Sequence, residues 1–421
     1  MAPLNAKDIE KLTPPSFAST QVAAVSEEPP KASPPPFPEG GLQGWLTLIG
    51  SYTNAFGVYQ DFYIREYLNH FTPEKIGWIG GIQLFLVFSM GLMTGPLFDR
   101  GYFVLLHALA LFTLSVTQAN QYYQIILSQG VCFGLASGLT YVPTLTVVSH
   151  YFQRRRPLAM GVVAAGSALG AVLHPIMLNK LFNNPRIGFH IGVRISAALN
   201  VFLLIIACLI TRTRLPPQKD KRPPPIGSFF RDTPYAIFIL GMVLVFFGLF
   251  FPIFYIQIDS ITHNVDRELS FYALSILNAA SIFGRTVPSL FAPKLGVFNL
   301  FLFFTLGSGI ILLCMIALKD AVGVVLLSVF YGFFSGAGTI TLIRSIGSFA
   351  RSLDELGARI GVVFAFCGKA TYCIPITGAL LGSQLHWTRA ILFAGITLIA
   401  SIVILLIPRY ILGRRRNTQK V

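Results

Sequence analysis

A basic residue lies inside a long apolar stretch of this sequence, where an ionised side chain needs a partner. Arg285 lies about two-thirds along the stretch 269–292, with Asn278 and Ser281 seven and four residues before it. At helical spacing these three side chains share one face, which places a guanidinium and two hydrogen-bonding groups where a carboxylate could bind. An anion site is one interpretation of Arg285. An arginine that reaches the helix end or makes a structural pair is the other.

A second basic residue, Lys369, lies near the middle of the apolar stretch 358–382. A desolvated lysine can exchange a proton, because burial favours its neutral form. We therefore expect Lys369 to line a central cavity, as a substrate-binding or proton-coupling group. A structural pair and an incidental contact with an aqueous vestibule are the alternatives.

Several other polar residues within apolar stretches are candidates for lining a substrate cavity, with interhelical hydrogen bonding as the alternative. They are Asn54, Tyr59, Gln60, Tyr141 and Gln257. Asp61 and His174 are candidates for proton coupling. The alternatives are an external salt bridge with Arg65 for Asp61 and a hydrogen-bonded core position for His174.

The composition indicates the elements that must hold these residues. Hydrophobic residues are 54% of the 421 residues and charged residues only 12%, against about 25% charged in soluble domains. Apolar runs of roughly 20 residues match the thickness of a bilayer core, where a spanning run must be helical. We expect an all-α membrane protein with twelve transmembrane helices in two six-helix halves. The predicted spans are 42–64, 76–98, 102–119, 122–150, 157–180, 188–211, 234–258, 269–292, 296–318, 321–344, 358–382 and 387–408.

The regions between and around these spans give the expected domain organisation. A proline-rich, disordered cytoplasmic tail covers 1–40, an N-terminal six-helix half 41–211, a basic cytoplasmic linker 212–232, a C-terminal six-helix half 233–408, and a basic cytoplasmic tail 409–421. Residues 1–40 lack the basic and apolar pattern of a signal peptide.

The distribution of charge predicts the orientation. With both termini in the cytoplasm, 22 Lys and Arg residues face inward and seven face outward, as the positive-inside rule requires. The net charge of +15 therefore indicates topology and not nucleic-acid binding. We expect a multi-pass protein of the plasma membrane.

Small residues at four-residue spacing predict close helix packing. Gly130, Gly134 and Gly138 recur in one span, and Gly332 and Gly336 in another. Surfaces that slide during transport are the alternative interpretation.

The stretch from Gly95 to Gly101, Gly-Pro-Leu-Phe-Asp-Arg-Gly, resembles the signature between helices 2 and 3 of the major facilitator superfamily. In that superfamily the glycine permits close helix approach, and the acidic and basic residues form a charge relay that holds the inward gate. The resemblance therefore implies gating roles for Gly95, Asp99 and Arg100. A solvated turn is the alternative.

Within that superfamily, several stretches are similar to the monocarboxylate porters, particularly their fungal branch. They are 39–45, 134–143, 151–161, 166–170 and 278–288. Three departures distinguish this chain from the animal members. It has no lysine in 56–60, Ser281 stands where an Asp is expected, and Pro293 replaces the Asp of the second cytoplasmic motif.

The resemblance implies a secondary active transporter of small organic solutes, monocarboxylates in particular, that works by alternating access. Proton coupling is left open. The alternative is an exporter of a larger acidic secondary metabolite, which the missing lysine and the 37 phenylalanines favour. A sensor with a transporter fold would need a long signalling tail. No nucleophile–base set, metal spacing or phosphate loop occurs, so we expect no enzyme, cofactor or metal. The expected partners are a small organic acid, protons and the lipid bilayer, without nucleic acid.

Overall fold

The structure is a computed structural model, and every element in the part of the chain it describes is helical. The described residues are 59, 62–90, 102–141, 156–210, 226–317, 319–350, 353–382 and 384–420. All of them belong to one compact unit, Phe37–Val421.

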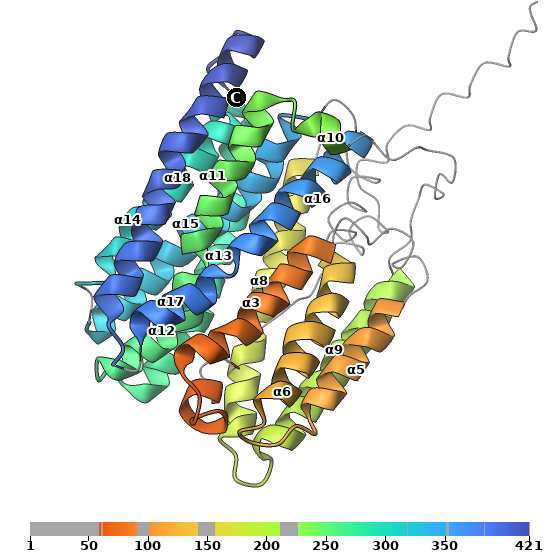
Figure 1. The fold of residues 1–421 in the computed structure, drawn as a ribbon, viewed down its shortest axis with the longest axis vertical. Helices are drawn as coiled ribbons and strands as arrows, with labels where there is room; N and C mark the ends of the chain where they lie inside the picture. The colour runs from red at the N-terminus through yellow and green to blue at the C-terminus, as the bar shows by residue number, and fades with distance from the viewer. Residues whose placement is uncertain are drawn as a thin grey trace, which may run out of the picture. The chain divides into compact units, whose positions relative to one another are not determined.

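Helices of the first predicted half lie in the N-terminal part of the described chain (Figure 1). They are η2 (Tyr63–Tyr67), α3 (Pro73–Ser89), α5 (Tyr102–Leu114), α6 (Tyr122–Ile125), η4 (Ile126–Phe133), α8 (Arg156–Phe182) and α9 (Gly188–Ile210). The elements η2 and η4 are π-helical, and after η4 the chain continues as α-helix to Tyr141.

The remaining helices follow residue 225, the first of them in the predicted linker 212–232 and the others in the second predicted half. They are α10 (Ile226–Phe229), α11 (Thr233–Leu249), α12 (Phe251–Thr262), α13 (Arg267–Leu295), α14 (Val297–Cys314), α15 (Ala321–Gly347), α16 (Leu353–Ala370), α17 (Cys373–Leu381) and α18 (Trp387–Arg416). In Figure 1, α14, α18, α11 and α15 lie together, and α5 lies beside α9, as their contacts require.

Short polar residues set several helix starts. The Thr72 hydroxyl accepts from the Lys75 amide and precedes Pro73, a residue suited to the first turn. The Asp266 carboxylate caps α13 by accepting from two amides, and the Asp320 carboxylate caps α15 by accepting from the Gly323 amide. These caps lie close to the predicted starts of spans 8 and 10.

Six helical segments among the described residues are long and apolar enough to cross a membrane. They are Gly188–Leu209, Thr233–Thr262, Val297–Cys314, Ala321–Gly347, Glu355–Leu381 and Trp387–Arg416. Of the other predicted spans, 42–64, 76–98 and 122–150 lie partly outside the described residues, and α5 is shorter than the predicted 102–119. The last helix continues through Arg416, so part of the predicted tail 409–421 is helical.

Two of the predicted spans are broken helices. Span 7 divides into α11 and α12 beside Pro252, and the Tyr331 hydroxyl of α15 donates to the Leu249 carbonyl at the break, at 2.7 Å. Span 11 divides into α16 and α17. There the Thr371 hydroxyl donates to the Gly81 carbonyl of α3, at 3.1 Å. At the first break a hydroxyl of another helix satisfies a backbone carbonyl, and at the second the hydroxyl of the break itself bonds to a carbonyl of another helix.

The predicted glycine surfaces are close helix contacts. A Cβ atom built on Gly134 would lie 3.1 Å from the Gln83 carbonyl oxygen of α3, and one on Gly336 would lie 2.7 Å from the Ser281 carbonyl oxygen of α13. These contacts join the second and fourth predicted spans of one half and the corresponding spans of the other. The same packing relation in both halves is expected of an internal repeat.

Gly332 is the position on α15 where an added methyl group should cost most. A Cβ atom there would overlap with the Leu277 carbonyl oxygen of α13, whereas one on Gly338 would find its nearest neighbour, Thr305 Oγ1, at 3.9 Å. We expect Gly332→Ala to lower the free energy of unfolding by about 1–3 kcal/mol. Gly338→Ala, the control on the same helix, should be neutral or stabilising because alanine favours helix. Thermal unfolding in detergent compares them, and equal midpoints would contradict the predicted close contact.

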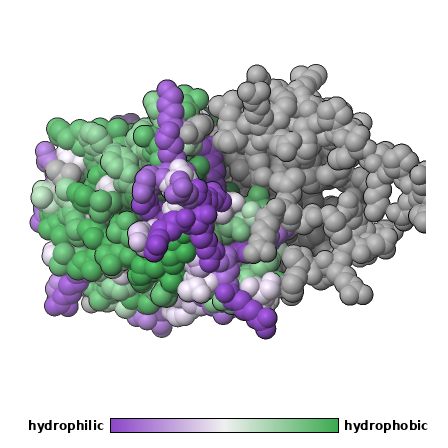
Figure 2. Space-filling model, turned by 90° about the horizontal axis from the view of Figure 1, so that it is seen from above, coloured by the Kyte–Doolittle hydropathy of each residue, from purple (hydrophilic) through white to green (hydrophobic). Residues whose placement is uncertain are grey.

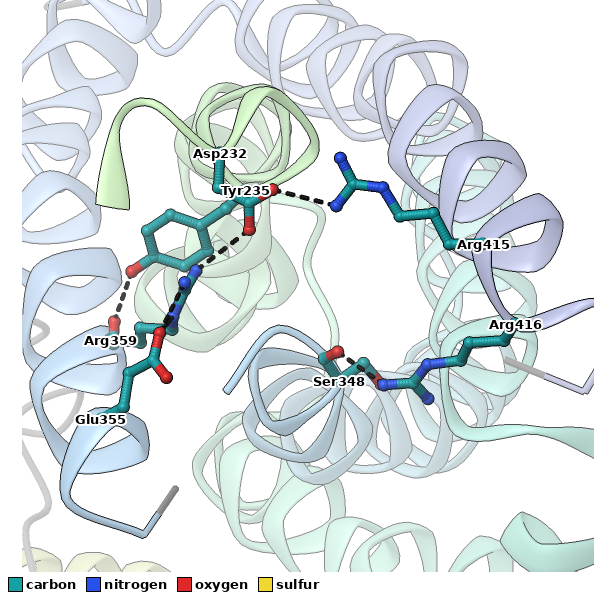
Figure 3. A network of polar contacts seen from close by, with 7 residues as sticks. All are labelled: Asp232, Tyr235, Ser348, Glu355, Arg359, Arg415 and Arg416. Carbon is teal, nitrogen blue, oxygen red and sulfur yellow. Dashed lines mark hydrogen bonds and ion pairs between the residues drawn. The ribbon is translucent and has the colours of Figure 1, made fainter. Parts of the chain in front are cut away.

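A polar network joins four helix ends near the C-terminus (Figure 3). The guanidinium of Arg359 on α16 contacts the Glu355 carboxylate at 2.7 Å and the Asp232 carboxylate at 3.5 Å. The Phe229 and Tyr235 rings lie 4.7 and 4.4 Å from that guanidinium.

The end of α18 completes this network. Arg415 pairs with Asp232 at 3.1 Å, and Arg416 donates to the Ser348 carbonyl at 2.7 Å. Seen from this end, hydrophilic residues gather over the middle of the coloured surface, with hydrophobic residues around them (Figure 2). The C-terminal residues thus fasten α18 to the ends of α11 and α15.

Candidate functional site: a cation beside an aromatic junction

Arg285 lies on α13 and bonds to a different helix. Its Nη1 donates to the Ala164 carbonyl and, at 2.7 Å, to the Ser167 hydroxyl, both on α8. Hydrogen bonds from a guanidinium are stronger than those between neutral groups. Arg285 therefore links the predicted spans 5 and 8, one from each half.

The two polar residues predicted to share a face with Arg285 bond within their own helix. Asn278 Nδ2 donates to the Leu274 carbonyl at 2.9 Å, and Ser281 Oγ donates to the Asn278 carbonyl at 3.0 Å. Both side chains are buried. Of the three predicted ligand groups, Arg285 is therefore the one whose bonds above reach another helix.

Five aromatic side chains from four predicted spans meet in what we term the aromatic junction. Its members are Phe88, Tyr141, Phe246, Phe250 and Phe364. Phe88 of α3 stacks on Phe364 of α16 with centroids 5.3 Å apart and planes 13° apart. Tyr141 stands nearly perpendicular to both, at 5.6 Å from each.

Tyr141 connects the aromatic junction with the cation. It lies within electrostatic range of Arg285, and its ring contacts Phe88 and Phe364. Tyr141 is therefore a predicted cavity residue that lies near Arg285. The arrangement offers apolar ring faces and one positive charge, which suits an anion with an aromatic or apolar body.

Tyr59 and Gln257 are buried in other parts of the fold. The Tyr59 ring contacts Tyr63 and Phe182, with centroids 6.1 and 6.0 Å away, in a separate aromatic group. Gln257 lies on α12 and is 2% exposed. The ring contacts of Tyr59 are thus with residues outside the aromatic junction.

His174 occupies a hydrogen-bonded position between two helices. Its Nε2 lies 3.1 Å from Ser196 Oγ and 2.9 Å from Asn200 Nδ2, both on α9. This geometry is the core arrangement that the sequence offered as the alternative to proton coupling.

Other predicted site residues lie outside the described residues. They are Asn54, Gln60, Asp61, Gly95, Asp99 and Arg100. Their roles in binding, proton coupling and gating stay predictions.

The role of Lys369 in a central cavity stays a prediction. Lys369 is exposed, and its Nζ lies 5.6 Å from the centroid of the Phe366 ring, one turn back along α16. Phe366 in turn contacts Phe230, which follows the short helix α10. A side chain on a helix tilts toward the N-terminal end, so this lysine extends along the helix surface toward that end.

We accordingly expect Lys369→Ala to change transport of an acidic solute by less than about twofold, because an exposed amine contributes little to a buried site. The measurement is uptake of a labelled acid into membrane vesicles at equal protein amounts. A loss of tenfold or more would contradict this expectation and support Lys369 as a substrate-binding or proton-coupling group.

One buried carboxylate was not among the candidates predicted from the sequence. Asp259 on α12 is 4% exposed, and its Oδ1 lies 3.2 Å from His263 Nδ1. The predicted span 234–258 ends one residue before Asp259. The i, i+4 spacing of Asp259 and His263 was the available signal.

These features, a packed helical membrane fold with a charged group between its two predicted halves, define a transporter-like protein. A family model described as the Major Facilitator Superfamily matches residues 44–350, and the chain belongs to that superfamily. It has the superfamily's fold and is a multi-pass membrane protein.

Two relatives show the narrower similarity. The chain is 35% identical over 390 residues to the aspyridones efflux protein apdF of Emericella nidulans, covering 87% of this chain and 80% of that protein. It is 34% identical over 417 residues to the agnestins efflux protein AgnL12 of Paecilomyces divaricatus, covering 94% and 92%.

Solved structures share the fold at low sequence identity. A single-residue variant of the E. coli fucose:proton symporter FucP aligns with a TM-score of 0.60 at 14% identity, covering 87% of this chain and 97% of that one. The nucleoside transporter NupG aligns with a TM-score of 0.59 at 16% identity, covering 87% and 96%.

Proposed function

We propose that this protein is a secondary active transporter that exports an acidic, largely apolar metabolite. Two six-helix halves, 41–211 and 233–408, would rock about a site between them. The solute would be released on the side away from the termini, which we place in the cytoplasm. The membrane would be the plasma membrane.

Arg285 carries this proposal. An arginine within a membrane span is costly and faces the protein interior or a water-filled path. Here it reaches from α13 to α8, helices of different halves, beside the rings of the aromatic junction. A substrate anion that pairs with Arg285 would compete with Ala164 and Ser167 for it. Binding could thereby loosen a contact between the halves.

The relatives support export of a metabolite over import of a small acid. Two of them are named as efflux proteins, one for aspyridones and one for agnestins. This agrees with the interpretation drawn from the missing helix 1 lysine and the abundant phenylalanine.

Contacts between the halves support a state closed at one end. Arg267 at the start of α13 pairs with Glu66 of η2 at 3.7 Å. A Cβ atom on Gly378 of α17 would lie 2.9 Å from the Glu74 Cα of α3. In the proposed topology these residues lie at the outer face. Gly95, Asp99 and Arg100 would close the inner face in the alternate state.

Monocarboxylate transport is the second candidate. The similarity of 134–143 and 278–288 to monocarboxylate porters favours it, as does a cation suited to a carboxylate. Asp61 and His174 would then be the groups to examine for proton coupling.

Uptake into membrane vesicles of defined orientation separates the candidates. The probes are labelled 2-naphthoate, a bulky apolar acid, and labelled lactate. Uptake of naphthoate but not lactate into inside-out vesicles is the result expected of the proposed exporter. Lactate uptake into right-side-out vesicles would favour the second candidate. Transport of neither acid above vesicles lacking the protein would contradict both.

A further inference from the structure

The aromatic junction is built across the two predicted halves. Phe88 and Tyr141 come from the first half, and Phe246, Phe250 and Phe364 from the second. Phe88 lies 5.3 Å from both Phe246 and Phe364, and Tyr141 lies 5.6 Å from Phe364.

A solute that passes between the halves must part some of these rings. Parting a stacked pair loses ring contacts, and water replaces them poorly because the ring faces are apolar. A ligand that itself presents a flat ring restores such contacts. A flexible aliphatic chain covers the same surface without the stacking geometry.

The pair Phe88 and Phe364 has the geometry that such a ligand would use. The two rings are nearly parallel, and Tyr141 closes one side as an edge-on wall. Both phenylalanines are buried, so a ligand ring that parted this pair and entered between the two rings would be screened from water. Arg285 lies on the Tyr141 side, where a group attached to the ligand's ring would meet a positive charge.

We propose that the aromatic junction is the specificity element of the transport site and selects planar aromatic acids, with the ring between Phe88 and Phe364 and the anionic group toward Arg285. This inference rests on the proposed function and narrows it to one class of substrate. Aromatic stacking would select ligands with a flat ring, and the Arg285 cation would select ligands with a negative charge.

Equilibrium binding to the purified full-length protein in detergent tests the inference. The probes are 2-naphthoate, the neutral 2-naphthamide and decanoate, an aliphatic acid of similar size. Wild type is expected to bind naphthoate about tenfold more tightly than either of the others. Phe364→Leu should reduce the naphthoate preference over decanoate to about threefold or less, leaving decanoate affinity unchanged. Phe303→Leu, at an exposed position of α14, should change neither affinity.

Size-exclusion profiles show whether each variant is folded, and Phe88→Leu replaces Phe364→Leu if the latter is not. Equal affinity of wild type for naphthoate and decanoate would overturn the inference and leave the proposed function standing. Equal losses for both acids in the folded variant would also overturn it. Binding of none of the three probes would count against the proposed function as well.

Discussion

Replacing Arg285 by glutamine is expected to lower the affinity for an acidic solute by about 10- to 100-fold, while the neutral analogue of the same shape is bound unchanged. A hydrogen bond that involves a charged group contributes roughly 1.5–3 kcal/mol, which corresponds to that range. The guanidinium donates to the neutral oxygens of Ala164 and Ser167, which hold its charge between α13 and α8. An anionic substrate would add a charge-assisted interaction that glutamine does not provide.

Arg194 provides the matched control for this substitution. It lies on α9, is exposed, and its Nε donates to the Ser115 hydroxyl at 3.3 Å. Arg194→Gln therefore removes an arginine–hydroxyl bond without touching the aromatic junction. Binding of naphthoate and naphthamide to each purified variant is the measurement. Equal losses for the acid and the amide in Arg285→Gln would assign Arg285 a purely structural role.

The largest expected effect on stability comes from Arg359→Gln, at about 3–5 kcal/mol of unfolding free energy. The side chain of Arg359 is 5% exposed, and its loss leaves the Glu355 carboxylate without this cation and the Asp232 carboxylate with Arg415 alone. It also removes the cation from beside the Phe229 and Tyr235 rings. Arg359 thus holds α16 to the start of α11.

Two further variants separate charge from packing in this network. Arg415→Gln removes an arginine whose side chain is 57% exposed, so its cost should stay below about 1 kcal/mol. Glu355→Gln should restore part of the stability lost in Arg359→Gln, because it removes the carboxylate that the lost guanidinium contacted at 2.7 Å. Denaturation of each variant in detergent gives the values. An Arg359→Gln protein as stable as Arg415→Gln would show that the network does not hold the helix ends together.

The helical fold was predictable because apolar runs of bilayer length leave the backbone few other options. The glycine surfaces were also predictable, because glycines at four-residue spacing in a membrane span let two helices approach closely, as they do at Gly134 and Gly336. The helix breaks at Leu249 and Thr371 were not predictable from the sequence. Each depends on a hydroxyl or a backbone group of a distant helix, which a local pattern does not contain.

The site was predictable to the extent that charge is rare in a span. Arg285 stood out by type, but its partners on α8 come from tertiary packing. Lys369 stood out equally, and the structure places it at an exposed position of α16. The aromatic junction was hidden among 37 phenylalanines. Only the fold shows that Phe88 and Phe364 meet.

Transport by the purified protein tests the central claim, that this chain carries an acidic apolar solute through a site containing Arg285. Proteoliposomes preloaded with unlabelled 2-naphthoate would be diluted into labelled 2-naphthoate, and exchange would be followed over time. Wild type should accumulate label well above empty liposomes, and Arg285→Gln, shown to be folded, should fall to about a tenth of that rate or less. Exchange by Arg285→Gln at the wild-type rate would contradict the account.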